Sequence, residues 1–150
     1  MQTRDVMTRM LAVARPETTL KEAAEKMRAL DIGVLPVCEG AKVEGVVTDR
    51  DIVIRAVAEG HDPSTTSVRD VMTREAFFVY DDQDVKDAGK LMSDLQVRRL
   101  IVLDRDGNIA GIVSLGDLAI DTGDEKMAGK VLNKVSQPTH DTGEHMEGRI

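Results

Sequence analysis

The chain has 150 residues, a formal net charge of −7, and a composition that is 41% hydrophobic but only 2% aromatic. This length can bury a core without disulfides or metal ions, and an aliphatic composition suits sheets covered by helices. The negative charge argues against nucleic-acid or anionic-membrane partners, and no apolar run is long enough for a signal peptide or a membrane-spanning helix, so we expect a cytoplasmic protein.

The first part of the chain alternates between strand-like and helix-like patterns. In chain order, the patterns predict a strand at Leu11–Val13, a helix over 20–30, strands over 34–38 and 43–48, and a helix that begins near Asp51 and ends by Gly60. Thr19 followed by Glu22 has the form of a capping box for the first of these helices.

The second part repeats this order after a polar stretch of loop composition. In chain order, it predicts a strand at Ala76–Val79, a helix over 85–95 capped by Asp84, strands at Arg99–Leu103 and Ile109–Ser114, and a helix that begins near Asp117 and ends by Gly123. A final helix is predicted over 125–135, with Met127, Val131 and Leu132 on one side, followed by a polar, mobile tail from Gln137.

The two parts are copies of one unit. Residues 5–9 recur letter for letter as residues 70–74, and the same spacing relates many later residues, among them Leu20 and Val85, Met27 and Met92, and Leu35 and Leu100; after one extra residue in the turn of the second copy, Asp51 matches Asp117. A lone three-stranded sheet with helices on one face leaves its other face apolar and uncovered. We therefore predict an α/β (α+β) fold in which two pseudo-symmetric β-α-β-β-α repeats pack sheet to sheet, with repeat 1 at 1–60, a linker at 61–69, repeat 2 at 70–123, and a C-terminal helix and tail at 124–150.

Residues suited to catalysis are scarce. His61 lies in the linker, and His140 and His145 lie in the polar tail, where adventitious metal binding is the alternative to a solvated tail. Cys38 has no partner thiol, so we expect a buried small side chain, with a redox-active thiol as the alternative. We predict no catalytic residues, no metal site and no enzyme activity.

A hydroxyl followed three residues later by a carboxylate occurs at the same place in both copies. These pairs, Thr48 with Asp51 and Ser114 with Asp117, lie where a strand feeds a helix. Each pair could simply cap its helix. It could also bind a nucleotide, because a carboxylate accepts hydrogen bonds from ribose hydroxyls while the hydroxyl and the free N–H groups of a helix start meet phosphate.

Arg98 and Arg99 break the symmetry of the copies, since Gly33 and Val34 occupy their positions in the first copy. Two arginines at the entrance to an apolar strand require an anion if they are buried. We expect that anion to be a phosphate, bound mainly by Arg99.

The motifs above resemble those of tandem cystathionine-β-synthase (CBS) domains, the pair known as a Bateman module, in its stand-alone bacterial form. The resemblance covers residues 5 to about 120 and includes the segments 31–37, 45–52, 96–100 and 111–117. It implies adenine nucleotides (AMP, ADP or ATP) or S-adenosylmethionine as regulatory ligands bound in clefts between the repeats, and a homodimer as the assembly.

The resemblance also implies two sites of unequal strength. The stronger would use Asp117 for ribose, Ser114, Arg98 and Arg99 for phosphate, and, around adenine, Thr8, Ala12, Ile32, Val34 and Ile112. The weaker would use Thr48, Asp51, Thr73, Phe77, Val97 and Val46. In the weaker site the arginines are missing and Phe77 replaces the small Ala12.

The leading functional hypothesis is therefore a regulatory sensor that changes conformation or dimer geometry when it binds an adenine nucleotide, and so signals to a protein on another chain. One alternative is a ligand-independent scaffold whose repeats only dimerise. A second alternative is an enzyme acting on a nucleotide.

Overall fold

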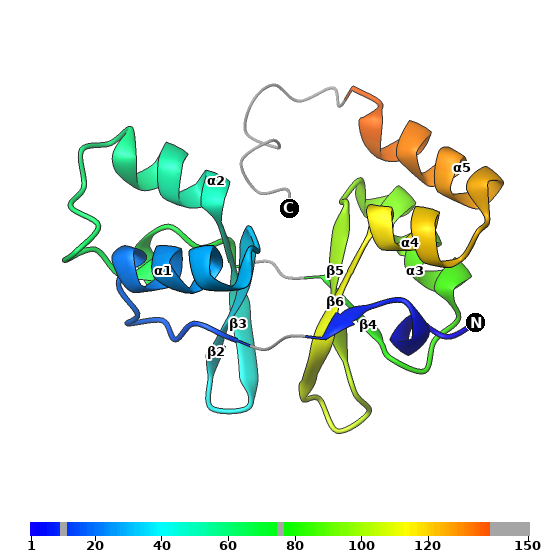
Figure 1. The fold of residues 1–150 in the computed structure, drawn as a ribbon, viewed down its shortest axis with the longest axis horizontal. Coiled ribbons are helices and arrows are strands. Elements are labelled where there is room, and N and C mark those ends of the chain that lie inside the picture. The colour runs from blue at the N-terminus through cyan, green and yellow to red at the C-terminus, as the bar shows by residue number, and fades with distance from the viewer. Residues whose placement is uncertain (10–11, 75–76, 139–150) are drawn as a thin grey trace. The chain divides into compact units, whose positions relative to one another are not determined.

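The computed structural model describes residues 1–9, 12–74 and 77–138 (Figure 1). Its contacts divide the chain into two units: unit 1 comprises Met1–Met10 and Phe77–Ile150, and unit 2 comprises Leu11–Ala76. The units do not follow the predicted repeat boundaries. The first ten residues belong with the second repeat, and the segment 61–76 belongs with the first.

Unit 2 is built on an antiparallel hairpin next to a helix. Its elements are α1 (Leu20–Leu30), β2 (Val34–Glu39), β3 (Lys42–Thr48), α2 (Asp49–Ile52), which continues as a π-helical turn η2 (Val53–Val57), and a 3-10 turn η3 (Val68–Asp70). The predicted helix and the two predicted strands are thus present. Thr19 caps α1 as expected, because its hydroxyl accepts a hydrogen bond from the backbone N–H of Glu22.

The strand predicted at Leu11–Val13 is wrong in the part that the structure describes. Leu11 lies outside the described residues, and neither Ala12 nor Val13 is in a strand. Pairing is limited to Ala14, which forms a single parallel bridge with Val37. A three-residue apolar run can fill a core without extending a sheet, and the sequence pattern does not separate the two cases.

Unit 1 contains a four-stranded sheet in the order β1-β6-β5-β4. The strands are β1 (Thr8–Arg9), β4 (Phe78–Tyr80), β5 (Arg99–Leu103) and β6 (Ile109–Ser114), and the helices are a 3-10 turn η1 (Thr3–Asp5), α3 (Val85–Leu95), α4 (Leu115–Asp121) and α5 (Glu125–Ser136). The bounds predicted for β5 and β6 are confirmed. The strand predicted at Ala76–Val79 is shifted toward the C-terminus, with Ala76 outside the described residues.

The duplicated segments at 5–9 and 70–74 each add an antiparallel neighbour to a hairpin. Thr8 pairs with Ile112 in unit 1, and Thr73 bridges Val46 in unit 2. Both approaches need a glycine, because a Cβ on Gly111 would collide with the carbonyl oxygen of Thr8, and a Cβ on Gly45 would collide with that of Thr73. The two glycines match in the repeat, so each copy keeps the same close backbone crossing.

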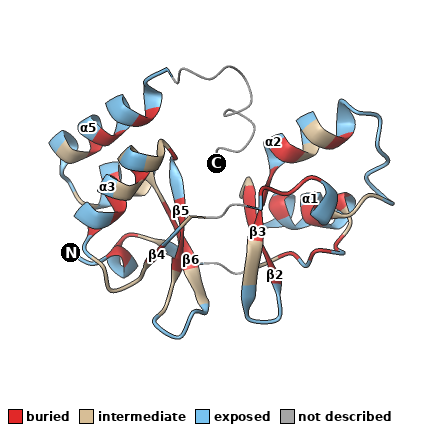
Figure 2. Ribbon diagram, turned by 180° about the vertical axis from the view of Figure 1, so that it is seen from behind, coloured by how far each residue is buried: buried red, intermediate tan, exposed pale blue. Residues whose placement is uncertain are grey.

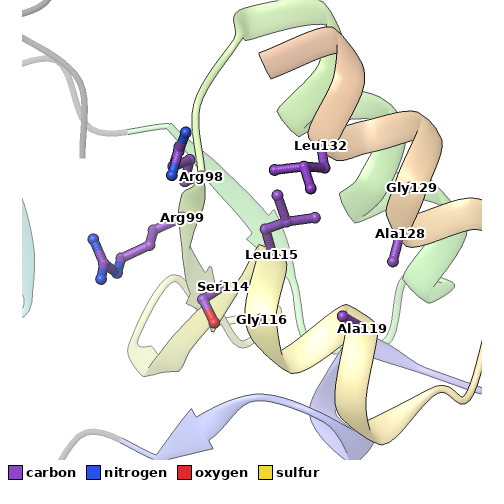
Figure 3. Close-up of a pocket in the computed structure, with 9 residues that line it drawn as sticks. All are labelled: Arg98, Arg99, Ser114, Leu115, Gly116, Ala119, Ala128, Gly129 and Leu132. Atoms are coloured by element: carbon purple, nitrogen blue, oxygen red, sulfur yellow. The ribbon is translucent and has the colours of Figure 1, made fainter. Parts of the chain in front are cut away.

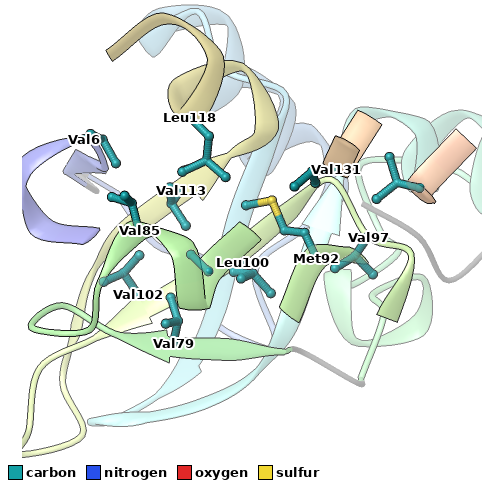
Figure 4. Close-up of a cluster of buried hydrophobic side chains, with 12 residues drawn as sticks. Val6, Val79, Val85, Met92, Val97, Leu100, Val102, Val113, Leu118 and Val131 are labelled. Atoms are coloured by element: carbon teal, nitrogen blue, oxygen red, sulfur yellow. The ribbon is translucent and has the colours of Figure 1, made fainter. Parts of the chain in front are cut away.

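Each unit has its own aliphatic core. In unit 1 the core lies between the sheet and the helices (Figure 4) and comprises Val6, Val79, Val85, Ala88, Met92, Val97, Leu100, Val102, Val113, Leu118, Val131 and Val135. In unit 2 it comprises Ala14, Leu20, Ala23, Met27, Leu35, Val37, Val47, Ala56, Val68, Val71 and Met72. Val6 and Val71 are equivalent residues of the duplicated segment, so each copy of that segment also contributes to a core.

The helix α5 rests on α3 and α4. Ala128, Val131 and Val135 form its buried face, whereas Leu132, predicted to share a face with Val131, is 48% exposed. Exposed residues cover the outer turns of α3 and α5 (Figure 2). Within the described part of the chain, no helix is both long and apolar enough to cross a membrane.

Candidate functional site

A cavity of about 580 Å³ lies in unit 1 where β5, α4 and α5 come together (Figure 3). Its lining residues are Arg98, Arg99, Ser114, Leu115, Gly116, Ala119, Ala128, Gly129 and Leu132. Figure 3 shows Leu115 of α4 and Leu132 of α5 facing each other, with the two guanidinium groups on the side away from Ala128. The cavity therefore has an apolar wall and a cationic side.

The two arginines line the cavity at the start of β5. Both are exposed, although the neighbouring Val97 and Leu100 are buried. Burial, the condition under which these arginines would require an anion, is therefore not met, and anion binding stays a prediction. Their side chains make no ion pair or hydrogen bond within the described residues. What remains is two unneutralised cations beside one cavity, which still favours an anionic ligand.

Ser114 and Asp117 are held together by a reciprocal capping box at the start of α4. The Asp117 backbone N–H donates to the Ser114 hydroxyl oxygen at 3.1 Å, and the Ser114 backbone N–H donates to Oδ2 of Asp117 at 2.8 Å. The capping role that the sequence left open is thus present. Oδ1 of Asp117 has no hydrogen-bond partner among the residues that the structure describes.

The structure brings together only part of the predicted stronger site. Arg99 pairs with Ser114 across β5 and β6, and Thr8 pairs with Ile112 across β1 and β6. Asp117, Thr8 and Ile112 do not line the cavity. The three remaining predicted residues, Ala12, Ile32 and Val34, belong to unit 2, so their participation in this site stays a prediction.

In the equivalent capping box of unit 2, an arginine contacts the carboxylate oxygen that is free of the box. Asp51 is 4% exposed, and its Oδ2 accepts from the Thr48 backbone N–H at 2.9 Å. Its Oδ1 lies 3.9 Å from Nε of Arg55, whose Nη1 also donates to the Val71 and Met72 carbonyl oxygens. Burial raises the pKa of Asp51, and the hydrogen bonds from Thr48 and the charge of Arg55 act in the opposite direction.

The other residues predicted for the weaker site are divided between the units. Thr73 and Val46 are bridged in unit 2, and the Thr73 hydroxyl has no hydrogen-bond partner among the described residues. Val97 is part of the unit 1 core, and Phe77 packs against that core. Because these four residues belong to different units, a site that combines them stays a prediction.

The first copy carries a negative charge where the second copy forms its cavity. Asp49 occupies the position of Leu115, and a Cβ on Gly33 would lie only 2.8 Å from Oδ2 of Asp49. A carboxylate thus covers the glycine that replaces Arg98. The two copies therefore differ in charge at the positions of Arg98 and Leu115, although the first copy has an exposed cation, Arg50, at the position of Gly116.

Sequence reasoning missed the contribution of α5. Ala128, Gly129 and Leu132 line the cavity from a helix that has no counterpart in the first copy. The available signal was Leu132, an apolar residue beside the buried stripe of α5. Its distance in the sequence from β5 gave no indication that the two elements meet.

Cys38 behaves as a buried small side chain, as predicted. It is 6% exposed, and burial raises the pKa of its thiol, which disfavours the reactive thiolate. Among the described residues, no three histidine, cysteine, aspartate or glutamate side chains are grouped to bind a metal ion. His140 and His145 lie outside the described residues.

Comparison with known families gives two matches along this chain. The model of the CBS domain matches residues 4–57 and 68–120. The CBS domain-containing protein YhcV of Bacillus subtilis is 38% identical over 133 residues, which cover 89% of this chain and 94% of YhcV. These matches confirm two CBS repeats.

Solved structures support the same fold. The crystal structure of Hypoxic Response Protein I with two coordinated zinc ions is 33% identical with a TM-score of 0.70, covering 79% of this chain and 97% of that one. The crystal structure of CBSX2 in complex with AMP is 27% identical with a TM-score of 0.67, covering 83% of this chain and 98% of that one. AMP is thus a ligand of one structural relative.

Proposed function

Because this chain belongs to the CBS-domain family, we propose that it is a regulatory module whose ligand is an adenine nucleotide bound at the unit 1 cavity. One observation carries the proposal: Arg98 and Arg99, with no ion-pair partner in the described chain, line a cavity of about 580 Å³ together with the Ser114 hydroxyl. This volume lies within the range of small-molecule sites.

The lining arginines, together with predicted residues outside the lining, suggest how each part of a nucleotide would be bound. The guanidinium groups suit phosphate oxygens, which they can contact through paired N–H donors. Oδ1 of Asp117 is available to ribose hydroxyls without breaking the capping box, because Oδ2 alone accepts from Ser114. By the resemblance to other CBS pairs, adenine would contact Thr8, Ile112 and residues of the first repeat.

Charge favours AMP, ADP or ATP over S-adenosylmethionine at this cavity. The arginines attract phosphate and repel the sulfonium cation of S-adenosylmethionine. Charge also explains why we rank the site of the first repeat as weaker. There the carboxylate of Asp49 lies at the position of Leu115, and Arg55 already engages Oδ1 of Asp51.

Signalling would follow from a shift between conformations that bind the nucleotide with different affinities. The cavity wall formed by α5 offers a route, because a ligand that contacts Leu132 also contacts a helix with a largely exposed outer face. We propose that a regulated protein on another chain recognises this change. A homodimer is the expected assembly of the module.

The test is calorimetric titration of the whole chain with AMP, ADP, ATP and S-adenosylmethionine. We expect at least one phosphorylated nucleotide to bind and Arg99→Ala to weaken its binding about 10- to 100-fold, since a charge-assisted hydrogen bond contributes roughly 1.5–3 kcal/mol. Arg105→Ala is the matched control. It removes an arginine of unit 1 that pairs with Asp82 outside the cavity, so affinity should not change.

Asp117→Ala and the 2′-deoxy nucleotide test the ribose assignment, and both should lower affinity. Binding that is undiminished in Arg99→Ala and Asp117→Ala would overturn the site. An absence of binding with all four ligands would overturn the sensor proposal and leave a dimerising scaffold.

A further inference from the structure

A second cavity, of about 400 Å³, lies in unit 1 between the outer faces of α3 and α5. Its lining residues are Lys86, Gly89, Lys90, Ser93, Asp124, Lys126, Met127, Lys130 and Val131. It shares no residue with the cavity proposed for the nucleotide, which α5 lines through Ala128, Gly129 and Leu132. The two cavities therefore lie on different flanks of the same helix.

Four lysines converge on this cavity from two helices. Lys86 and Lys90 are one turn apart on α3, and Lys126 and Lys130 are one turn apart on α5, so each pair shares a helix face. The first repeat lacks this concentration. Lys21 matches Lys86, but Glu25 stands where the second copy has Lys90.

The positive charge of this cavity is not neutralised from within. None of the four lysines forms an ion pair in the part of the chain that the structure describes. The single carboxylate in the lining, that of Asp124, accepts a hydrogen bond at 2.9 Å from the Met127 backbone N–H at the start of α5. Asp87 and Asp94 of α3 line a different cavity, to which Lys90 also contributes.

The floor of the cavity is apolar. Gly89 has no side chain, so Val131 of α5 packs closely over it, and a Cβ at that position would lie 3.3 Å from Cγ2 of Val131. Met127 lies beside them and supplies a flexible apolar surface. An apolar floor ringed by cations fits a ligand that has both apolar and anionic groups.

We propose that this α3–α5 groove binds an acidic, amphipathic segment of a partner protein. Carboxylates of the segment would face the four lysines, and an apolar side chain would contact Met127 and Val131, as when a helix docks in a groove. Lysine presents a mobile point charge instead of the planar fork that selects phosphate, which favours spaced carboxylates as the anionic groups. The net charge of −7 of the whole chain disfavours nucleic acid.

The position of α5 connects this groove to the proposed function. Because the helix lines both cavities, a nucleotide that contacts Leu132 would change how α5 presents Lys126 and Lys130. This regulatory step rests on the proposed nucleotide site. The docking groove itself does not, since its lining residues are distinct.

The test is fluorescence anisotropy with a labelled synthetic helical peptide of glutamate and leucine, titrated with the whole chain. We expect saturable binding that weakens with salt, and about a tenfold loss of affinity in the double variant Lys90→Glu with Lys130→Glu. Lys21→Glu is the matched control, because it reverses the equivalent charge of α1 and should leave affinity unchanged. AMP titration of the same variants should give the wild-type affinity.

Several results would overturn the groove as a peptide site. One is equal binding of the peptide by the wild-type chain and the double variant, or an equal loss in Lys21→Glu. Another is equal affinity for a peptide with serine in place of leucine, or full competition by inorganic triphosphate, which would indicate a simple anion site. A third is loss of a dimer in the double variant by light scattering, which would assign the groove to a second copy of this chain. Absence of binding by AMP, ADP and ATP with the peptide results intact would refute the nucleotide site and leave the groove standing.

Discussion

At the scale of single residues, Asp51 and Asp117 differ more than their equivalent positions suggest. Each carboxylate forms a capping box with the hydroxyl residue three positions before it, so both helices begin in the same way. Asp51 is 4% exposed and lies beside Arg55, whereas Asp117 is half-buried and keeps one oxygen unpartnered within the described chain. The motif therefore caps a helix in both copies, and only in the second copy does the carboxylate keep an oxygen without a partner among the described residues.

The burial of Asp51 makes a prediction about pH. Its pKa is raised from the ordinary value of 3.8, chiefly by burial. Below that value Asp51 is protonated in both the folded and the unfolded chain. As pH rises, the unfolded chain loses this proton first, so the contribution of Asp51 to folding falls until pH has passed the folded-state pKa.

We therefore expect the free energy of unfolding of the wild type, relative to Asp51→Asn, to decrease as pH rises above the ordinary pKa of 3.8 and to level off once pH has passed the folded-state pKa. Urea unfolding at several pH values measures this difference. Thr48→Ala is the control: it should cost about 1 kcal/mol through loss of the cap, yet retain the pH dependence, since the carboxylate is still there. Parallel pH profiles for wild type and Asp51→Asn would contradict the prediction.

At the scale of elements, α1 and α3 end in the same strained way but with different consequences. Asp31 and Gln96, equivalent residues, close these helices with φ values of 54° and 53°. A non-glycine residue in this left-handed conformation costs roughly 1 kcal/mol. Gln96 also donates through Nε2 to the carbonyl oxygens of Lys134 and Gln137, at 3.1 and 3.3 Å, and so ties α3 to the end of α5.

Glycine substitutions separate these two effects. Asp31→Gly should raise the free energy of unfolding by about 0.5–1 kcal/mol, because it relieves backbone strain and, among the described residues, removes no side-chain hydrogen bond or ion pair. Gln96→Gly relieves the same strain but loses two hydrogen bonds, each worth about 0.5–1.5 kcal/mol, so it should be neutral or destabilising. Urea unfolding compares the two variants. Equal stabilisation by both would show that Gln96 does not hold α5.

The sequence predicted those helices and strands whose own residues show a periodic apolar pattern or flanking turn residues. Alternation and turn residues predicted β5 and β6 with the bounds that the structure has, and apolar spacing predicted α1 and α3. The pairing of β1 involves only Thr8 and Arg9, and two residues carry no periodicity. In the apolar run at 11–13, Ala12 packs against the core of unit 2 and is not in a strand.

Only those residues of the candidate site that carry a local sequence signal could be predicted. Arg98, Arg99 and Ser114 could be found because comparing the copies exposed an asymmetry and a duplicated motif. The exposure of the two arginines could not be predicted, because the residues on either side of them are apolar and buried, and such a pattern predicts a buried strand. The wall contributed by α5 depends on a contact between elements distant in the sequence, and no local pattern encodes it.

At the scale of the whole molecule, the repeat in the sequence and the folded unit are different divisions of the chain. Unit 2 takes Val68, Val71 and Met72 into its core from the segment after the predicted boundary at residue 60. Backbone hydrogen bonds secure that segment, with Leu20 N–H donating to the Thr66 carbonyl oxygen and Val68 N–H to that of Thr18. A cut between the sequence repeats would therefore remove part of a core.

Two fragments test this division. Fragment 11–76 keeps the whole core of unit 2, whereas fragment 1–60 loses Val68, Val71 and Met72 and carries Val6, whose contacts lie in unit 1. Each lost side chain is worth about 1.5–3 kcal/mol, so together they match the entire stability of a small domain. We expect a cooperative urea transition, followed by circular dichroism, for 11–76 and none for 1–60.

Val71→Ala in fragment 11–76 serves as the intermediate case. It should retain the transition but move its midpoint to lower urea, because one buried side chain is truncated while the hydrogen bonds to Thr18 and Thr66 remain. A cooperative transition of fragment 1–60 at the midpoint of 11–76 would mean that the sequence repeat is itself the folding unit. The packing of residues 5–9 in the core of unit 1, and of residues 70–74 in the core of unit 2, would then contribute little to stability.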